Sequence, residues 1–407
     1  MCAFYPSIKY AIGITKGVYL MNRLKKLLIV SCLCLLTSCT SETVSEPETA
    51  QPTPVINRLT DNYTVEEVKL PDELIPNDWM NITLFYQIKD YQFRAYILNK
   101  SISNLYPVES VYDYNLLTGE LNQVEFNTES NIRVMDMVTD NNGKAYELIM
   151  HYVDSGVESY VNYEGKLVEG TENLTLSTYN IRGFQKLNDK LYLLLENSVD
   201  YDHTVWNLYE LNNGEAKIVY DYATNRTWGL DKEADVEGII LPPIQKNSSH
   251  QMGWVMQKEG KYFIQVFAGD TVESYEVPLC PMLVVSLTNG IYYTTYDTND
   301  ENEIIRNSFY RLNTDTGEST LISDLTSELG MTYQISDQEF YYNGLFEYAP
   351  VCRAETDELK CRKIEGIPLA SYINGVYSID DKTDLIYQGS YNDENAEVPS
   401  LYLIHWK

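Results

Sequence analysis

The sequence predicts an all-β fold built from repeated units, on the basis of three observations. Between residues 63 and 406, short segments rich in Tyr, Val, Ile and Leu alternate apolar and polar residues, which is the pattern of strands with one buried face. Turn-forming pairs such as Asn142-Gly143 and Asn289-Gly290 separate these segments, and such pairs favour hairpins. Long segments with the 3.6-residue period of a helix are nearly absent.

A glycine turn that follows a strand recurs at a nearly constant spacing. Gly119, Gly165 and Gly214 lie 46 and 49 residues apart, and Gly317 follows Gly214 after 103 residues, close to two further periods. This is the period of a β-propeller blade, a four-stranded sheet. We therefore predict a propeller of seven blades, with six or eight blades, or an array of β-sandwiches, as alternatives. The seven units cover residues 78–128, 129–172, 173–222, 223–280, 281–325, 326–366 and 367–407.

A closed ring requires the two ends of the domain to share one blade, because an open ring exposes strand edges. Residues 63–70 and 401–406 alternate in the manner of strands, and we expect them to pair. Residues 63–407 are therefore predicted to form a single propeller domain, although a chain of 407 residues would otherwise suggest two or three domains.

The N-terminal region has the layout of a secretory signal peptide. A basic stretch at residues 22–26 precedes an apolar run at residues 27–36 and small residues that end in Cys39, an order typical of signal peptides. The apolar run is shorter than the roughly 20 residues that a transmembrane helix needs. Met21 directly precedes the basic stretch, so we expect translation to start there and residues 1–20 to be an N-terminal extension.

The end of this signal, Leu36-Thr37-Ser38-Cys39, resembles the lipobox of bacterial lipoproteins. The resemblance implies that residues 1–38 are removed and that Cys39 carries the lipid anchor; an ordinary cleaved signal is the alternative. Residues 39–62 are rich in Ser, Thr, Glu and Pro near their start and are predicted to form a flexible tether. We therefore expect a protein anchored to the bacterial cell membrane on its extracytoplasmic side.

The charge of the chain restricts its partners. The formal net charge is −29, and it becomes −34 once residues 1–38 are removed, since they carry five basic residues and no acidic one. Nucleic acids require clustered Lys and Arg, so we predict no nucleic-acid partner. The 35 Tyr are assigned mainly to strand pairing and packing between blades.

Two turns carry a resemblance to a known type of propeller. Thr-Gly-Glu follows a Tyr-containing strand at residues 115–120 and again at residues 313–318. These turns resemble those of bacterial extracytoplasmic β-propellers with quinoprotein-like or surface-layer-type repeats. The resemblance covers the turns and the period, and it implies a fold rather than an active site.

Four cysteines belong to the expected mature chain: Cys39, Cys280, Cys352 and Cys361. Cys352 and Cys361 flank an acidic segment that reads as a hairpin loop, and extracytoplasmic proteins retain disulfides. We predict a disulfide between them, worth about 2.5–3 kcal/mol for a loop of this size. Two buried free thiols are the alternative, and Cys280 is expected to remain unpaired beside Pro281.

Sequence motifs for catalysis or cofactor binding are missing. The chain contains no Gly-x-Ser-x-Gly elbow, His-Glu-x-x-His helix, Walker loop or dinucleotide fingerprint. Its four His are scattered, so we predict no metal centre and no cofactor. Residues 297–303 and 392–397 have the oxygen density that Ca²⁺ favours without the EF-hand spacing, which leaves structural calcium as an alternative.

Three residues are the candidates for ligand contact. Asp202 and His203 form a carboxylate and imidazole pair that could tune a base, although a solvated hairpin loop is the better explanation. Trp228 lies in an insertion outside the blade pattern and could project over a face of the ring. None of the three is assigned a catalytic role.

These observations favour a binding protein over an enzyme. We expect the propeller to bind or scaffold a protein or glycan at the cell envelope. The alternative is an enzyme that acts on extracellular polysaccharide through carboxylates in the central channel. That alternative predicts a funnel lined by several Asp or Glu with raised pKa values, close to Trp or Tyr.

Overall fold

The computed structural model describes most of the chain from residue 56 onward. The described residues are 56–76, 81–99, 106–126, 131–153, 156–171, 174, 176–187, 190–198, 203–225, 238–241, 251–269, 271–281, 283–287, 289–298, 304–325, 332–336, 338–342, 350–355, 357–368, 372–391 and 397–407. Within them, the only helix is the 3-10 turn η1 (Asp72–Leu74). No helix in these ranges is long and apolar enough to cross a membrane.

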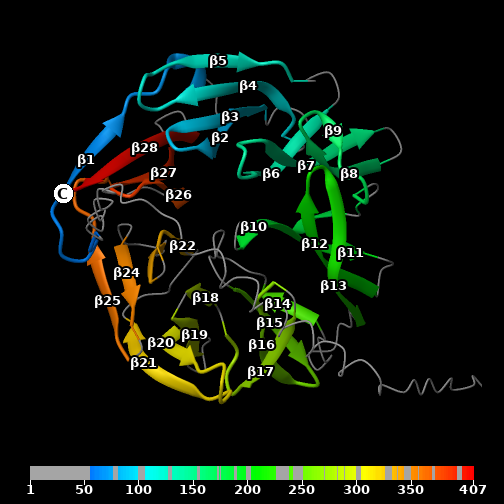
Figure 1. The fold of residues 1–407 in the computed structure, drawn as a ribbon, viewed down its shortest axis with the longest axis vertical. Helices are drawn as coiled ribbons and strands as arrows, with labels where there is room; N and C mark the ends of the chain where they lie inside the picture. The colour runs from blue at the N-terminus through cyan, green and yellow to red at the C-terminus, as the bar shows by residue number, and fades with distance from the viewer. Residues whose placement is uncertain are drawn as a thin grey trace, which may run out of the picture. The chain divides into compact units, whose positions relative to one another are not determined.

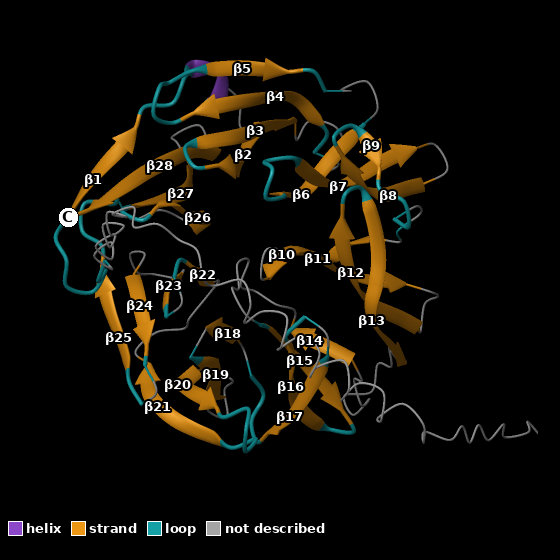
Figure 2. Ribbon diagram, in the orientation of Figure 1, coloured by secondary structure: helices purple, strands orange, loops and turns teal. Residues whose placement is uncertain are grey.

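Seven four-stranded antiparallel sheets form a ring (Figures 1 and 2). Chain order and blade order agree, so the colours of Figure 1 run around the ring. Each blade is a meander whose first strand lies nearest the centre of the ring. The prediction of an all-β, seven-bladed propeller is confirmed.

The first four blades take up residues 81–277, and their strands are as follows. Blade 1 contains β2 (Asn81–Lys89), β3 (Gln92–Asn99), β4 (Val108–Asn115) and β5 (Leu121–Val124); blade 2 contains β6 (Ile132–Thr139), β7 (Ala145–Val153), β8 (Gly156–Tyr163) and β9 (Lys166–Leu167). Blade 3 contains β10 (Leu176–Leu187), β11 (Lys190–Ser198), β12 (His203–Asn212) and β13 (Glu215–Asn225); blade 4 contains β14 (Gly238–Leu241), β15 (Met252–Lys258), β16 (Lys261–Phe267) and β17 (Val272–Val277).

The last three blades complete the ring, and the seventh takes its outer strand from the N-terminal end of the domain. Blade 5 contains β18 (Leu283–Leu287), β19 (Gly290–Thr298), β20 (Ile304–Leu312) and β21 (Ser319–Leu325); blade 6 contains β22 (Thr332–Gln334), β23 (Glu339–Tyr342), β24 (Pro350–Ala354) and β25 (Leu359–Lys363). Blade 7 contains β26 (Tyr372–Asp380), β27 (Thr383–Tyr391), β28 (Glu397–Trp406) and β1 (Tyr63–Val68).

The ring closes through the two ends of the domain, as the sequence predicts. β1 pairs antiparallel with β28, in a register that runs from Tyr63 opposite Trp406 to Val68 opposite Leu401. The strands of the first six blades also fall within the first six predicted units, except that β13 runs past the end of the third unit to Asn225. The turn spacing therefore located the blades correctly.

The two Thr-Gly-Glu turns have the same local chemistry. At the first, the Asn115 side-chain oxygen accepts hydrogen bonds from the backbone N–H groups of Leu117 and Thr118 at 2.9 and 3.0 Å. Gly119 then adopts a φ of 72°, which glycine tolerates best. At the second turn, Asn313 accepts from residues 315 and 316, and Gly317 has a φ of 74°. An Asn before the loop and a Gly near its end therefore define the repeated turn.

Apolar residues from adjacent blades share each of the main cores. Tyr96 and Leu98 of blade 1, for example, pack in one cluster with Val134 and Ile149 of blade 2. Many tyrosines are part of these cores, as expected from their number. The fully buried ones are Tyr96, Tyr146, Tyr192, Tyr292, Tyr293 and Tyr341.

Buried carboxylates tie blades together at two junctions. Between blades 1 and 2, the Tyr96 hydroxyl donates to Glu147, and the Asn162 amide donates to the same carboxylate at 2.6 Å. Between blades 6 and 7, the Tyr341 hydroxyl donates to Asp384 at 3.1 Å. In each case the tyrosine and the acid lie on the second strands of neighbouring blades, so the same contact occurs at both junctions.

Arg58, which precedes β1, extends the second of these junctions. Its guanidinium donates to both oxygens of Asp384 at 2.7 and 3.0 Å and to Glu339 at 3.1 Å. The Trp406 indole N–H donates to Asp384 at 2.8 Å. All four side chains are almost fully buried. Burial alone would lower the pKa of Arg58, but the hydrogen bond and charge of Asp384 raise it instead.

Because of this network, the packed body begins earlier in the chain than the sequence predicts. The expected tether reached residue 62, whereas residues 56–62 lie against blades 6 and 7. Ile56 and Leu59 contact the core between these blades, and the Arg362 side chain donates to the carbonyl groups of Arg58 and Asp61 at 3.2 and 2.6 Å. Apolar and ionic contacts therefore fix this segment, and the predicted tether is too long by these seven residues.

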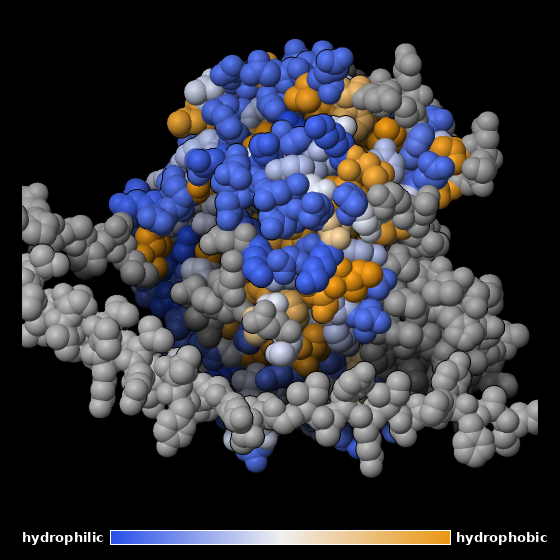
Figure 3. Space-filling view, turned by 45° about the vertical axis from the view of Figure 1, so that its right-hand side comes forward, coloured by the Kyte–Doolittle hydropathy of each residue, from blue (hydrophilic) through white to orange (hydrophobic). Residues whose placement is uncertain are grey.

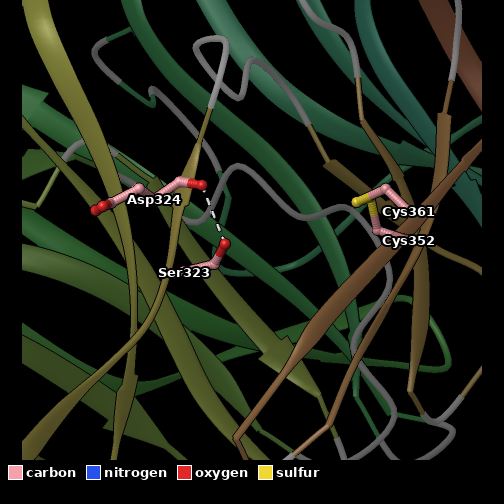
Figure 4. Close-up of a disulfide and its surroundings, with 4 residues drawn as sticks. All are labelled: Ser323, Asp324, Cys352 and Cys361. Carbon is pink, nitrogen blue, oxygen red and sulfur yellow. Dashed lines mark hydrogen bonds between the residues drawn. A yellow bond between two sulfur atoms is a disulfide. The ribbon is translucent and has the colours of Figure 1, made fainter.

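A disulfide joins β24 and β25 in blade 6. Cys352 lies directly opposite Cys361, with Cα atoms 4.1 Å apart. Figure 4 shows this bond together with Ser323 and Asp324 of β21, where the Ser323 hydroxyl donates to the Asp324 carbonyl. Cys280 has a free thiol, whose Sγ lies 3.8 Å from the carbonyl oxygen of Pro281.

Replacing Arg58 should destabilise the ring strongly. We expect Arg58→Met to lower the free energy of unfolding by about 3 kcal/mol, because Asp384 and Glu339 would stay buried without their shared cation. Guanidinium denaturation measures this change. Lys69→Met, at an exposed position just after β1, is the control and should change it by less than about 0.5 kcal/mol. Equal effects of the two substitutions would contradict the assignment.

Candidate functional site

A cavity of about 540 Å³ opens among the inner strands of the ring. Its lining comes from β2, β6, β10, β22 and β26, with Tyr387 contributed by β27. Where several residues of an inner strand contribute, they come mainly from its second half and from the turn that follows. These inner strands lie nearest the centre of the ring (Figure 2), and the cavity opens at the end where they finish.

Four tyrosines contribute to the cavity wall: Tyr86, Tyr333, Tyr377 and Tyr387. Three of their hydroxyls donate to main-chain carbonyls across blade junctions. Tyr377 donates to Phe85 at 2.8 Å, Tyr387 donates to Thr83, and Tyr333 donates to Ile373 at 3.3 Å. These hydrogen bonds hold the rings in fixed positions at the contacts of blade 7 with blades 1 and 6.

The phenols of Tyr86, Tyr333 and Tyr377 remain neutral at physiological pH. Burial raises the pKa of Tyr86 and of Tyr377 well above the usual value, and the nearby charge of Asp136 adds to the effect. Burial also raises the pKa of Tyr333. Tyr86 and Tyr377 nevertheless keep part of their side chains accessible. They offer a ligand an aromatic face and a neutral hydroxyl.

Asp136 is the buried carboxylate of the lining. Its Oδ2 accepts a hydrogen bond from the backbone N–H of Phe184 in blade 3 at 2.9 Å, and its Oδ1 accepts from Met137 at 3.0 Å. The approach is close because Gly183 has no side chain: a Cβ there would lie 2.3 Å from Oδ2. Both oxygens therefore bind main chain, and Asp136 joins blades 2 and 3.

Charged residues surround the mouth of the cavity. Asp90 and Lys89 follow one another at the end of β2, Asp140 follows β6, and Lys186 lies near the end of β10. Burial opposes ionisation of Asp140, but N–H groups of Lys144 and Asn142 and the Tyr163 hydroxyl lower its pKa. Asp140 is consequently an anion whose oxygens are occupied by protein donors.

A smaller cavity of about 210 Å³ adjoins the first one and shares Asp140 and Asn141 with it. Its other side is formed by blade 3, where Lys190 lies 3.3 Å from Glu210. Tyr146, also in the lining, accepts a hydrogen bond from the Gly214 N–H at 3.1 Å. The turn at residues 140–143 thus separates two neighbouring hollows.

The carboxylates of the lining bear on the alternative of a polysaccharide-cleaving enzyme. Its carboxylates in the described residues are Asp90, Asp136 and Asp140. Asp136 and Asp140 accept hydrogen bonds from protein donors, and the pKa of Asp140 is lowered rather than raised. A general acid needs a raised pKa at the reacting bond. The pKa of Asp140 is therefore shifted in the opposite direction to the one that the enzyme alternative predicts.

The side chains of the three ligand-contact candidates named from the sequence lie outside the described part of the chain. Asp202 and Trp228 lie outside the described residues, as does Cys39. His203 begins β12 opposite Asn225, but its side chain lies outside the description. Of the calcium candidates, residues 299–303 and 392–396 lie outside it as well. Within the described residues, no three His, Cys, Asp or Glu side chains converge as metal ligands.

Most of the cavity residues carry no recognisable signal in the sequence. Tyr86, Tyr333 and Tyr377 look like any other strand tyrosine, and the chain holds 35 of them. Gly183 offered the one usable signal, since an isolated glycine inside a strand often marks a bulge or a close approach. β10 does have register shifts beside it.

Comparisons with known proteins add little to this picture. No protein-family model matches the sequence, and a search of curated proteins gives no match. Among solved structures, the chain is similar to an acylaminoacyl peptidase of Pyrococcus horikoshii, at 13% identity and a TM-score of 0.47. That match covers 81% of this chain and 53% of the peptidase, so the chain spans about half of the peptidase's length.

Two further structures show a similar degree of likeness. The β-propeller domain of the Trilobed protease from Pyrococcus furiosus is 13% identical, with a TM-score of 0.49 and coverage of 79% of this chain and 95% of that domain. An oligogalacturonate lyase in complex with manganese is 9% identical, with a TM-score of 0.46 and coverage of 86% and 96%. Similarities at this level assign no activity or substrate to the chain.

The close approach at Gly183 can be tested by adding one methyl group. We expect Gly183→Ala to destabilise the protein by at least about 2 kcal/mol more than Gly119→Ala. Both glycines have positive φ, at 87° and 72°, so both substitutions introduce backbone strain. Only Gly183 faces another residue, whereas nothing lies within 4 Å of a Cβ at Gly119. Denaturation midpoints of the two variants give the difference, and equal midpoints would refute the contact.

Proposed function

We propose that this protein is a lipid-anchored, extracytoplasmic propeller that binds a glycan of the bacterial cell envelope in its central cavity. The observation that carries the proposal is the tyrosine-lined cavity of about 540 Å³, within the usual size range of small-ligand sites. Signal-like residues 22–38 and Cys39 support export and anchoring. The body itself then has no need to bind the membrane.

The cavity suits a sugar better than a wholly apolar ligand. A tyrosine combines an apolar ring with a polar hydroxyl, and a sugar ring likewise combines apolar C–H faces with hydroxyl edges. Tyr86 and Tyr377 are partly accessible in the lining, and Gln87 and Asn374 place amide groups beside them. These rings are held by packing and main-chain hydrogen bonds, so little order is lost on binding.

The distribution of exposed hydrophobic residues favours binding at one defined site over binding across a broad apolar face. In the view of Figure 3, hydrophobic residues are scattered among hydrophilic ones. The exposed large hydrophobics in the described residues are single residues on different strands and turns: Leu117, Val157, Leu167, Ile218, Leu279 and Leu321. Isolated residues of this kind need no partner, which favours ligand binding in the channel over docking of a large protein.

Lipid attachment at Cys39 can be measured directly. We expect cells that express the full chain and are fed labelled palmitate to incorporate the label into the protein, and expect Cys39→Ala to abolish it. The variant should also leave the membrane fraction, because an acidic body gains no help from anionic lipids. Cys280→Ala is the control and should retain the label. A labelled Cys39→Ala protein would refute the anchor.

Glycan binding can be measured on the purified body, residues 56–407, with a panel of neutral and acidic cell-envelope oligosaccharides. We expect at least one to bind, and expect Tyr86→Leu to weaken its binding at least about tenfold by removing an aromatic face. The control is Tyr275→Leu in the outer strand β17, which should leave binding unchanged. Binding of no oligosaccharide, or equal binding by both variants, would contradict the proposal.

A further inference from the structure

The central cavity contains two cations, Lys89 and Lys186, and one buried amide donor, Asn374, that no described group of the protein pairs with. We infer that the glycan bound there is acidic, with carboxylate groups recognised by Lys186, Lys89 and Asn374. This inference rests on the proposed function and specifies its ligand class. It depends on which polar groups of the lining already form hydrogen bonds or ion pairs within the protein.

Two ammonium groups line the cavity without an ion pair. Lys89 ends β2 and Lys186 lies near the end of β10, and both contribute to the lining. Among the described residues, neither the Lys89 nor the Lys186 ammonium group forms an ion pair or a hydrogen bond. Other lysines do find partners: Lys190 pairs with Glu210, and Lys261 with Glu276. The chain has 59 acidic and 30 basic residues, so acidic partners for lysine are abundant. Two lysines without an ion pair in one cavity are therefore notable.

Asn374 provides a third donor. Its side-chain nitrogen is buried, and no acceptor among the described residues bonds to it. Asn374 lies in the same lining, close along β26 to Tyr377. A buried donor without a partner costs about 1–3 kcal/mol, and a ligand oxygen in the cavity would recover that cost.

Two of the three acidic groups of the lining are already occupied by protein donors. Asp136 accepts N–H groups of Met137 and Phe184. Asp140 accepts the N–H groups of Asn142 and Lys144 at 2.8 and 3.0 Å, and the Tyr163 hydroxyl at 3.0 Å. Asp90, which is exposed, is the remaining acid of the lining. The lining therefore holds two ammonium groups without an ion pair against one carboxylate, Asp90, without a donor among the described residues.

The tyrosine hydroxyls offer a ligand acceptor oxygens rather than donors. Tyr377, Tyr387 and Tyr333 each donate their single hydroxyl hydrogen to a main-chain carbonyl, so they cannot donate it to a ligand as well. The donors that remain are the two ammonium groups and the Asn374 amide. A neutral sugar would leave the ammonium groups without a counter-charge, whereas a uronate supplies one carboxylate per ring and forms charge-assisted hydrogen bonds.

The overall charge makes this recognition short-ranged. A chain of charge −29 repels an acidic polymer at a distance, and the repulsion is screened within about 8 Å at physiological ionic strength. Binding then depends on direct contacts in the cavity. We therefore expect added salt to change the affinity only modestly between about 0.1 and 0.3 M.

The test compares tetragalacturonate with its fully methyl-esterified form, which has the same rings but no charge. Isothermal titration with residues 56–407 should show binding of the acid and at least tenfold weaker binding of the ester. Lys186→Gln should weaken binding of the acid about tenfold, equivalent to about 1.4 kcal/mol, and Lys89→Gln should act in the same direction. Lys166→Gln, at an exposed position in β9, is the matched control and should have no effect.

The outcomes separate this inference from the proposed function. Equal binding of acid and ester, or binding of the acid that is unaffected by Lys186→Gln and Lys89→Gln, would overturn the acidic ligand class while leaving glycan binding in place. Binding of a neutral envelope oligosaccharide but not of the acid would do the same. Binding of no oligosaccharide at all would overturn both. Lys186 and Lys89 are accessible, so thermal unfolding of both variants should match that of the parent protein.

Discussion

The closing contact of the ring is the constraint on which the rest of the structure depends. β1 supplies the outer strand of blade 7, and Arg58 just before it neutralises Asp384 and Glu339 in the core between blades 6 and 7. Arg353 approaches Glu339 from the other side at 2.6 Å. Two buried carboxylates would be costly without these cations. The segment that leads to the expected anchor is thus also the segment that completes the fold.

Closure and the cavity are built from the same blade. Tyr377 of β26 and Tyr387 of β27 bond to carbonyl groups of β2 in blade 1, so the wall of the cavity spans the junction between the last blade and the first. Asp136 ties blades 2 and 3 on the other side. A ring that opened at blade 7 would lose this wall, which links the stability of the closing strand to ligand binding.

The blades could be predicted from the sequence because their signals are local. Asn115 and Gly119 define a turn within six residues, and the same arrangement returns at Asn313 and Gly317. The site could not be predicted, since its contacts join residues that are far apart: Tyr387 and Thr83 are separated by 304 positions, and Arg58 and Asp384 by 326. A lone arginine in an otherwise tether-like segment gives no indication of its partner, and a strand tyrosine gives none of whether it faces a core or a channel.

Hydrogen exchange at the closing blade tests the dependence on Arg58 most directly. In the parent protein, the amides of β1 should exchange as slowly as those of β27, because both open only when the ring opens. In Arg58→Met, β1, β26 and the cavity strand β2 should lose protection together. Loss of protection in β1 alone, with β26 and β2 unchanged, would show that the N-terminal segment is a peripheral strand and would contradict the account.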